Sequence, residues 1–228
     1  MKLCVALDLP TKEENLTLVH QLKNEEIWLK VGLRSFIRDG QSLLQELKNI
    51  NPKCKIFLDL KIHDIPNTMA DAAESMANLG VDMFNVHASS GQKAMKMVME
   101  RLKEIPNPPI VLAVTALTSF NNTSFESIYN ASIESKVETF AKDAYESGLQ
   151  GVVCSVYESL MVKQHTHSSF LTLTPGIRPF HESHNDQERV ATLEDAKAQK
   201  SDFIVVGRPI YGSQDPLGVV QKILENIS

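Results

Sequence analysis

The feature that most constrains the fold is a series of short apolar runs that recurs along the whole chain. Eight such runs are present, and segments with helical patterning separate them. Continuous apolar runs are typical of strands buried on both faces, and their alternation with helices predicts βα units that build a parallel sheet. The runs are Leu3–Asp8, Ile27–Val31, Lys55–Lys61, Met83–His87, Ile110–Thr115, Gly151–Ser155, Phe170–Thr174 and Phe203–Val206.

Helix start signals occur between these runs. Thr11 and Glu14 form a capping-box pattern, and Gly80 and Gly148 are placed as C-terminal stops. Further helices are predicted from Pro66 to Leu79, from after Gly91 to Leu102, from Ile133 to Tyr145, and from Pro216. Eight strands and roughly eight helices with short connections predict a (β/α)8 TIM barrel in one domain, residues 1–228. An open doubly wound sheet is the alternative.

Composition limits the classes of partner. The chain has 228 residues, 43% of them hydrophobic, and a formal net charge of -5, with basic residues scattered along it. This distribution predicts no nucleic-acid or anionic membrane surface. No apolar stretch approaches the ~18 residues of a membrane-spanning helix, and the first residues lack a signal-peptide pattern, so we expect a soluble cytoplasmic protein. Cys4, Cys54 and Cys154 lack CxxC spacing and are expected to be buried thiols.

Two long polar connections follow strands, Leu117 to Ser132 and Pro175 to about Glu188. In a barrel such loops lie over the C-terminal face, where active sites are built. The second contains Gly176, Pro179 and a polar HESHNDQ stretch, which favours a lid that closes on a ligand. A flexible surface loop is the alternative.

Charged residues gather at the ends of the first three predicted strands. The period-two rule places Phe57, Asp59 and Lys61 on one face of the third strand, pointing toward the barrel axis. Asp64 follows just beyond this strand. Lys30 near the end of the second strand and Asp8 at the end of the first lead to the same mouth. The alternative interpretation is a buried ion pair that only closes the top of the barrel.

A second candidate site follows the last strand. Gly207 allows close approach to the backbone and Arg208 offers charge-assisted hydrogen bonds, which favours a phosphate site over mere surface charge. The pairs His181/His184 and His165/His167 lack an acidic third ligand at helical spacing, and we predict no metal. His87 ends the fourth strand and is able to face the site. Patterns for a nucleophilic serine, a P-loop or a dinucleotide fold are absent.

Taken together, the motifs resemble those of the orotidine 5′-phosphate decarboxylases, in order and over nearly the whole chain. DLKIHDIPNT is the most specific of them. The matching segments are ALD at Ala6–Asp8, KVG at Lys30–Gly32, DLKIHDIPNT at Asp59–Thr68, NVHAS at Asn85–Ser89, LTS at Leu117–Ser119, PGIRP at Pro175–Pro179, DQ at Asp186–Gln187 and VVGRPI at Val205–Ile210. The resemblance implies a homodimeric decarboxylase that needs no cofactor and converts orotidine 5′-phosphate to UMP and carbon dioxide in pyrimidine biosynthesis.

The resemblance also implies the roles of individual residues. Lys30, Asp59, Lys61 and Asp64 would form the catalytic set of charged residues, with Asp64 reaching the neighbouring subunit's site and Lys61 protonating the ring carbanion. Substrate contacts are implied for Asp8 and Lys30 at the ribose, Thr68 at the ribose from the partner chain, Thr118 at the pyrimidine edge, Arg178 on the lid, and Gln187, Gly207 and Arg208 at the phosphate. Ser90 and Tyr211 depart from the family pattern, and we expect them to change local loop shape.

Three other functions compete with this interpretation. A metal-dependent sugar-phosphate decarboxylase or synthase of the same superfamily shares the DxKxxD pattern, but typically has an acidic residue near the position of Lys30. A Schiff-base aldolase needs a neutral lysine, whereas two carboxylates near Lys61 favour its protonated form. A non-catalytic barrel that binds a phosphoribosyl ligand would be expected to lack part of the catalytic set of charged residues, and all four of them are present.

Overall fold

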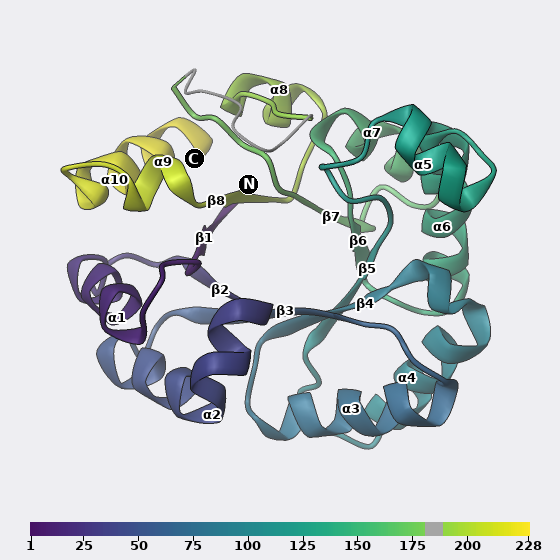
Figure 1. The fold of residues 1–228 in the computed structure, drawn as a ribbon, viewed down its shortest axis with the longest axis horizontal. Helices are drawn as coiled ribbons and strands as arrows, with labels where there is room; N and C mark the ends of the chain where they lie inside the picture. The colour runs from purple at the N-terminus through teal and green to yellow at the C-terminus, as the bar shows by residue number, and fades with distance from the viewer. Residues whose placement is uncertain (181–188) are drawn as a thin grey trace.

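The strands form a closed parallel barrel in which each pairs with its neighbours in the sequence and β8 pairs with β1 (Figure 1). The computed structural model describes residues 1–180 and 189–228. The predicted (β/α)8 barrel is confirmed, and the open doubly wound sheet is wrong. The strands are β1 (Lys2–Ala6), β2 (Trp28–Gly32), β3 (Lys55–Ile62), β4 (Met83–His87), β5 (Ile110–Val114), β6 (Gly151–Val153), β7 (Leu171–Thr174) and β8 (Phe203–Val206).

Every predicted apolar run overlaps one strand, and the bounds of β4 and β8 agree to the residue. Three strands end earlier than predicted, so that Asp8, Thr115 and Ser155 follow β1, β5 and β6. Ser155 instead caps the next helix, where the Glu158 carboxylate accepts its backbone N–H at 2.8 Å. Residues that follow the last hydrogen-bonded residue of a strand in this way supply polar groups to the carboxyl end of the barrel.

Helices surround the barrel (Figure 1). They are α1 (Lys12–Gln21), α2 (Leu33–Ile50), α3 (Pro66–Asn78), α4 (Gln92–Leu102), α5 (Asn122–Tyr129), α6 (Ile133–Glu146), α7 (Val156–His165), α8 (Leu193–Ala198), α9 (Arg208–Tyr211) and α10 (Pro216–Ile227), with the 3-10 turn η1 (Ala88–Ser90). The predicted capping box at Thr11 and Glu14 is present. Gly80 and Gly148 have φ of 74° and 85°, as C-terminal stops require. Within the described parts of the chain, no helix combines the length and apolar character needed to cross a membrane.

The connection from Leu117 to Ser132, predicted as a polar loop, contains helix α5. The Asn121 carboxamide caps it by accepting the Ser124 N–H at 3.0 Å. Phe125 is fully buried and stacks on Tyr129 with ring centroids 4.5 Å apart. A helix of 8 residues whose burial depends on one aromatic side chain carries too few apolar positions for a helical period to be recognised.

Apolar side chains form two separate cores. The larger lies between the strands and the helices, and it includes Ile56 and Leu58 of β3. The smaller fills the barrel axis with side chains such as Trp28, Phe57 and Phe203, and Trp28 packs edge-on against Phe203 at 5.2 Å. The predicted alternation along β3 is therefore confirmed for Ile56, Phe57 and Leu58. These side chains occupy the interior of the barrel, and a cavity lies at the carboxyl ends of the strands.

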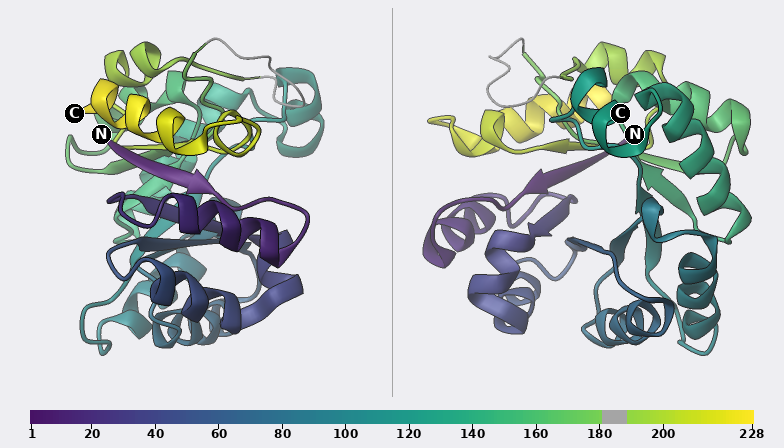
Figure 2. Two further views of the ribbon diagram at one scale, coloured as in Figure 1. Left: turned by 90° about the vertical axis from the view of Figure 1, so that its left-hand side faces the viewer. Right: turned by 45° about the vertical axis from the view of Figure 1, so that its right-hand side comes forward.

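The two ends of the barrel differ in chemistry. Both chain termini lie at one end, and β1 runs from there toward the other (Figure 2). At the amino end Asp82 forms ion pairs with Lys48 at 3.0 Å and Lys55 at 2.8 Å, and Lys163 pairs with Asp202 at 2.7 Å. The pairs of Lys48 and Lys163 join helices α2 and α7 to the starts of strands, and the pair of Lys55 joins the starts of β3 and β4. Most of the polar residues predicted to form a site lie at the opposite, carboxyl end of the barrel.

The backbone of β7 leaves no room for a side chain at Gly151 of β6. A methyl group on its Cα would lie 2.2 Å from the carbonyl oxygen of Leu171 in β7. We predict that Gly151→Ala lowers the free energy of unfolding by about 1–3 kcal/mol, because backbone atoms cannot move aside as a flexible side chain can. Urea denaturation of both proteins measures this, and an unchanged midpoint with an unchanged slope would contradict it.

Candidate active site

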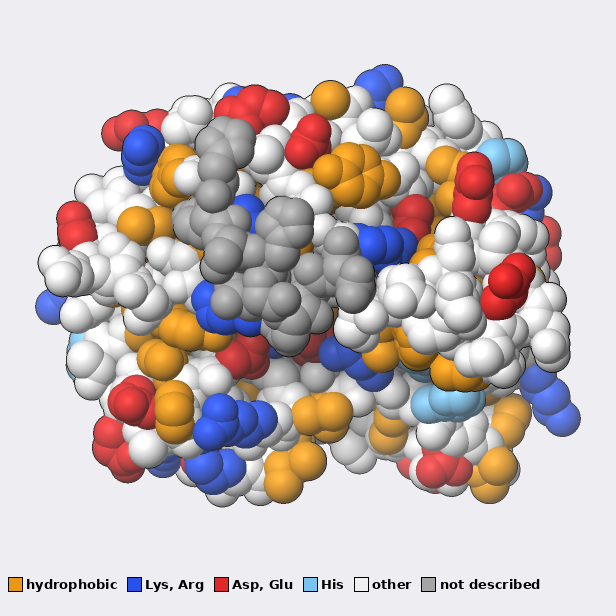
Figure 3. Space-filling model, turned by 45° about the horizontal axis from the view of Figure 1, so that its top comes forward, with side chains coloured by type: hydrophobic (Ala, Val, Ile, Leu, Met, Phe, Trp, Pro, Cys, Tyr) orange, Lys and Arg blue, Asp and Glu red, His pale blue; other side chains and the backbone are white. Residues whose placement is uncertain are grey.

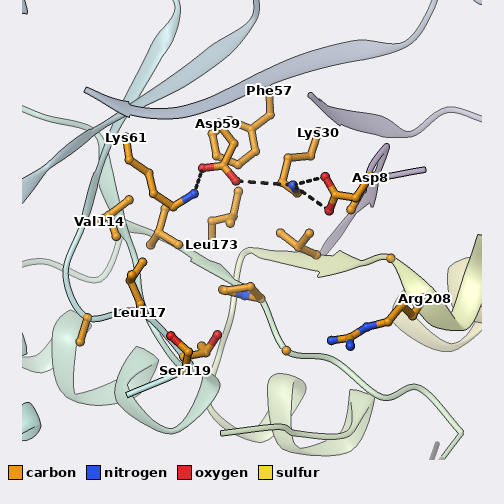
Figure 4. Close-up of a pocket in the computed structure, with 18 of the residues that line it drawn as sticks. Asp8, Lys30, Phe57, Asp59, Lys61, Val114, Leu117, Ser119, Leu173 and Arg208 are labelled. Carbon is orange, nitrogen blue, oxygen red and sulfur yellow. Dashed lines mark hydrogen bonds and ion pairs between the residues drawn. The ribbon is translucent and has the colours of Figure 1, made fainter. Parts of the chain in front are cut away.

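A cavity of about 300 Å³ opens at the carboxyl ends of the strands. Its size is at the lower end of the range for small-molecule sites. Side chains from β1, β2 and β3 line one wall, and the segments after β5, β7 and β8 line the others (Figure 4). The predicted site residues that line it are Asp8, Lys30, Asp59, Lys61, Thr118, Arg178, Gly207 and Arg208.

One wall of the cavity carries a row of alternating charges. The Lys61 ammonium lies 2.6 Å from Asp59 Oδ1, and the Lys30 ammonium lies 3.5 Å from Asp59 Oδ2. Lys30 also donates to both Asp8 oxygens at 3.2 Å. Figure 4 shows the four side chains in the order Asp8, Lys30, Asp59, Lys61, and Figure 3 shows acidic and basic side chains adjoining near the centre of one face. We call this row the charge array.

Because Lys30 and Asp59 are largely buried, the ionisation of each depends on the opposite charges beside it in the array. The Lys30 and Asp59 side chains are 12% and 13% exposed. Burial opposes ionisation of Asp59, but Lys30 and Lys61, together with hydrogen bonds from Lys61 and Asn85, hold the pKa of its carboxyl below the ordinary value. Burial likewise opposes the charge on Lys30, and the Asp59 and Asp8 carboxylates nevertheless raise the pKa of its ammonium. Both groups are therefore charged at neutral pH.

The backbone at Lys61 is not regular strand, contrary to the simple alternation used to predict its direction. Lys61 has φ of 53°, in the left-handed region, and the register of β3 with β4 shifts between Leu58 and Ile62. The side chain still reaches Asp59. The predicted direction is thus correct, but a bulge produces it rather than a regular pleat.

Asn85 of β4, part of the NVHAS motif, belongs to the site although it is not among the predicted site residues. Its side-chain NH2 donates to Asp59 Oδ1 at 2.7 Å, and its side-chain oxygen accepts the Lys61 backbone N–H at 2.7 Å. It is fully buried. The signal that points to it is a polar residue at an inward position of an apolar strand, two residues after Met83, which lies in the axial core.

Asp64 and Thr68 lie outside the cavity of their own chain. Both are exposed, and Asp64 Oδ1 accepts the N–H of Ile65 at 2.7 Å. Asp64 borders a shallow surface depression together with Ser89 and Ser90. Within one chain, Asp8 therefore occupies an end of the charge array and Asp64 does not join it.

The predicted phosphate residues line the opposite side of the cavity. Arg208, the first residue of α9, is drawn well away from Lys61 in Figure 4. A methyl group on Gly207 would lie 3.3 Å from both the Ala6 Cβ and the Tyr211 ring, so Tyr211 packs closely against this glycine. Gln187, also predicted here, lies outside the described residues, as does most of the predicted lid.

Arg178 is placed by backbone pairing with the chain that follows the predicted lid. Its side chain is largely buried, and its N–H donates to the Ala191 carbonyl at 2.9 Å. Ala191 N–H donates in return to Gly176 at 3.1 Å. This short parallel bridge holds the Gly176–Arg178 wall of the cavity.

Arg189 joins that same segment to the loop after β5. Its guanidinium pairs with Glu158 of α7 and donates to the carbonyls of Ala116 at 3.3 Å and Leu117 at 3.2 Å. Glu158 is largely buried. The ion pair therefore braces the loop that carries Thr118. Nothing in the sequence indicates this pair, since its partners lie 31 positions apart and come together only in the folded barrel.

The histidines do not build a cation site in the described part of the chain, where no group of three or more His, Cys, Asp or Glu residues is placed to hold a metal ion. His181 and His184 lie outside that part. His87 stacks on His63 with centroids 5.6 Å apart, and its Nδ1 lies 2.7 Å from Ser89 Oγ. Burial, His63 and Lys61 lower the pKa of His87 to about 4, so that it is neutral at physiological pH.

Comparison with known proteins agrees with this geometry. A family model described as orotidine 5′-phosphate decarboxylase / HUMPS family matches residues 1–223. Proteins named orotidine 5′-phosphate decarboxylase from Nitratiruptor sp. and Sulfurimonas denitrificans are each 64% identical to this chain over 227 residues, with full coverage of both chains. The crystal structure of orotidine 5′-phosphate decarboxylase from Lactobacillus acidophilus is similar, with 34% identity and a TM-score of 0.87 over 100% of this chain and 99% of that one. The chain therefore belongs to the orotidine 5′-phosphate decarboxylase / HUMPS family.

Proposed function

We propose that the protein decarboxylates orotidine 5′-phosphate to UMP and carbon dioxide, with Lys61 as the proton donor. The observation that carries the proposal is the charge array, in which Lys61 ends a row of alternating charges on the wall of one cavity, with Lys30 and Asp59 largely buried within the row. The named relatives at 64% identity support the substrate.

The chemistry requires a group that stabilises negative charge and then delivers a proton. When the bond between the ring and the carboxylate breaks, its electron pair stays on the ring carbon and carbon dioxide leaves. A fixed ammonium at that carbon stabilises the developing charge and then transfers a proton to form the C–H bond. Lys61, held at 2.6 Å from Asp59, is a positioned ammonium of this kind. It regains its proton from solvent after the product leaves.

Asp59 acts on the substrate before the bond breaks. Its lowered pKa keeps it an anion, so a substrate carboxylate placed beside it is repelled and the repulsion ends when neutral carbon dioxide forms. Lys30 on the other side of Asp59 keeps this anion stable in a buried position. Lys30 and Asp8 also face the cavity with polar groups suited to the ribose hydroxyls.

The rest of the cavity binds the parts of the substrate that do not react. We assign the phosphate to Gly207, Arg208 and Gln187, the pyrimidine edge to Thr118, and a further substrate contact to Arg178. Arg208 and Lys61 lie on opposite sides of the cavity, which suits a ligand with an anionic group far from its reacting carbon (Figure 4). Remote binding energy of this kind serves to hold the reacting group in place.

A second copy of the chain completes the site in this proposal. Asp64 and Thr68 are polar residues that are exposed outside their own cavity, as side chains that serve a neighbouring subunit must be. Ile65, between them in sequence, is 67% exposed, and Ile37 at the same end of the barrel is 78% exposed. Exposed aliphatic side chains at the end of the barrel that carries these polar residues favour an interface here.

Replacement of Lys61 tests the chemical step. We predict that Lys61→Ala loses decarboxylation by several orders of magnitude yet still binds UMP, because the phosphate and ribose contacts remain. Turnover of orotidine 5′-phosphate by absorbance and UMP binding by calorimetry measure the two effects. Lys53→Ala, which removes an exposed lysine, serves as the control and should leave both unchanged. Near-normal turnover in Lys61→Ala would exclude this mechanism.

Removal of metal separates the proposal from the sugar-phosphate alternative. We expect protein treated with EDTA to convert orotidine 5′-phosphate at its full rate, because the Lys61 ammonium supplies the charge stabilisation that a metal would otherwise supply. The assay follows substrate absorbance with and without added Mg²⁺. A rate that depends on added metal would favour the alternative.

Mixing two inactive variants tests the shared site. In a hybrid of Lys61→Ala and Asp64→Ala subunits, one site carries both defects and the other carries neither. Random exchange of subunits therefore predicts recovery of roughly a quarter of the unmutated activity. Native mass spectrometry checks that hybrids form. Hybrids that form without recovering activity would show that Asp64 serves its own chain.

A further inference from the structure

The Asp59–Lys61 segment leaves the regular ladder of the barrel. Leu58 of β3 pairs with Phe84, and Ile62 pairs with Val86. Three residues of β3 therefore lie opposite one residue of β4, Asn85, and the chain must arch. Bulges of this kind re-aim side chains next to active sites. Here the arch carries both the carboxylate and the ammonium of the proposed reaction.

An arch of this kind is unfavourable without a partner. The left-handed conformation at Lys61 is disfavoured for a residue with a Cβ, and a buried N–H that has left its ladder must find another acceptor. Asn85 supplies this acceptor, since its Oδ1 lies 2.7 Å from the Lys61 nitrogen. The NH2 of the same carboxamide donates a hydrogen bond to Asp59 Oδ1 at 2.7 Å. One side chain thus bonds both ends of the arch.

We propose that Asn85 is a positioning residue for the decarboxylation, which sets the place of the Lys61 ammonium by holding the Asp59–Lys61 arch at both ends. The inference rests on the proposed function. Asp59 Oδ1 accepts from Asn85 and from Lys61 Nζ together, so the orientation of this carboxylate fixes where the ammonium lies. A carboxamide suits the position because it is neutral. It donates and accepts without adding a charge to the array.

Other residue types at position 85 would satisfy only part of this arrangement. An aspartate keeps the acceptor for the Lys61 N–H but places a second carboxylate against Asp59 Oδ1. An alanine leaves both groups without their partner in a fully buried position. The two substitutions therefore have different consequences, and they separate the bond to the backbone from the bond to the carboxylate.

Asp59 titrates in contact with groups from several elements. Lys30 faces it from β2, Lys61 from β3 itself, and Asn85 from β4. Cys4 of β1 lies in the axial core, burial raises the pKa of its thiol, and it stays neutral, while Asp8 after β1 acts through Lys30. The bond from Asn85 is among the interactions that lower the pKa of Asp59. Its removal therefore raises that pKa.

The test compares two buried asparagines. Like Asn85, Asn51 accepts a backbone N–H, that of Lys53 at 3.1 Å, but its NH2 donates to the backbone carbonyl of Glu25 at 3.1 Å rather than to a carboxylate. It precedes β3 at the amino end of the barrel. We expect Asn85→Ala to lower kcat about 10²-fold, since a shift of about 1 Å in a reacting group has that effect, while UMP affinity changes little. Asn51→Ala should lose thermal stability and retain kcat.

The pH dependence supplies a readout that loss of stability does not change. Ionised Asp59 is required for the reaction, so the acid limb of kcat should move to higher pH in Asn85→Ala and further in Asn85→Asp, where two carboxylates meet. If Asn85→Ala does not fold, Asn85→Asp, which keeps the size, carries the test. An unchanged kcat and acid limb in a folded Asn85 variant, or an equal loss of kcat in Asn51→Ala, would overturn the inference. Absence of turnover in the unmutated protein would instead overturn the proposed function and this inference with it.

Discussion

The arrangement of the site depends on the ion pairs of Asp59, whose carboxylate is buried between two ammonium groups. A buried carboxylate is unfavourable unless opposite charges and hydrogen-bond donors surround it, and here they come from three adjacent strands. Lys30 approaches from β2, Lys61 from β3 and Asn85 from β4. Loss of any one would leave a buried charge or a buried polar group without its partner. The barrel register therefore serves as the frame that keeps these four side chains together.

The apolar cores explain why the charges remain at one end. Trp28, Phe57 and Phe203 fill the axis of the barrel, and the larger core seals the strands against the helices. The cavity that holds the charge array therefore lies at the carboxyl ends of the strands. The result is a cavity with a charged wall above an apolar floor, in which charges act at lower dielectric than in water. The ion pair of Arg189 with Glu158 and the hydrogen bond of Arg189 to the loop after β5 hold the walls of the cavity in place without contacting the charge array.

Prediction from the sequence was most accurate where a residue's environment follows from a local period. The strands were recognised because parallel strands buried on both faces form continuous apolar runs, and Asp59 was placed inward because strand residues alternate. The prediction was wrong for α5, a helix of 8 residues whose burial rests on Phe125 packed between Phe120 and Tyr129, which is too few apolar positions to show a helical period. It also missed the bulge at Lys61, because a register shift is a property of two paired strands rather than of either sequence.

The sequence by itself therefore determined the parallel barrel, the end at which polar groups gather, and the identity of the charged residues, since each follows from local patterning and from motifs in one stretch of chain. Only the tertiary structure decided how these residues meet. Pairing of β1 with β2 brought Asp8 to Lys30 across 22 positions, and pairing of β3 with β4 placed Asn85 opposite the Asp59–Lys61 arch. The same packing left Asp64 exposed, outside the array of its own chain. Contacts of this kind depend on strand register and chain closure, which no local period encodes.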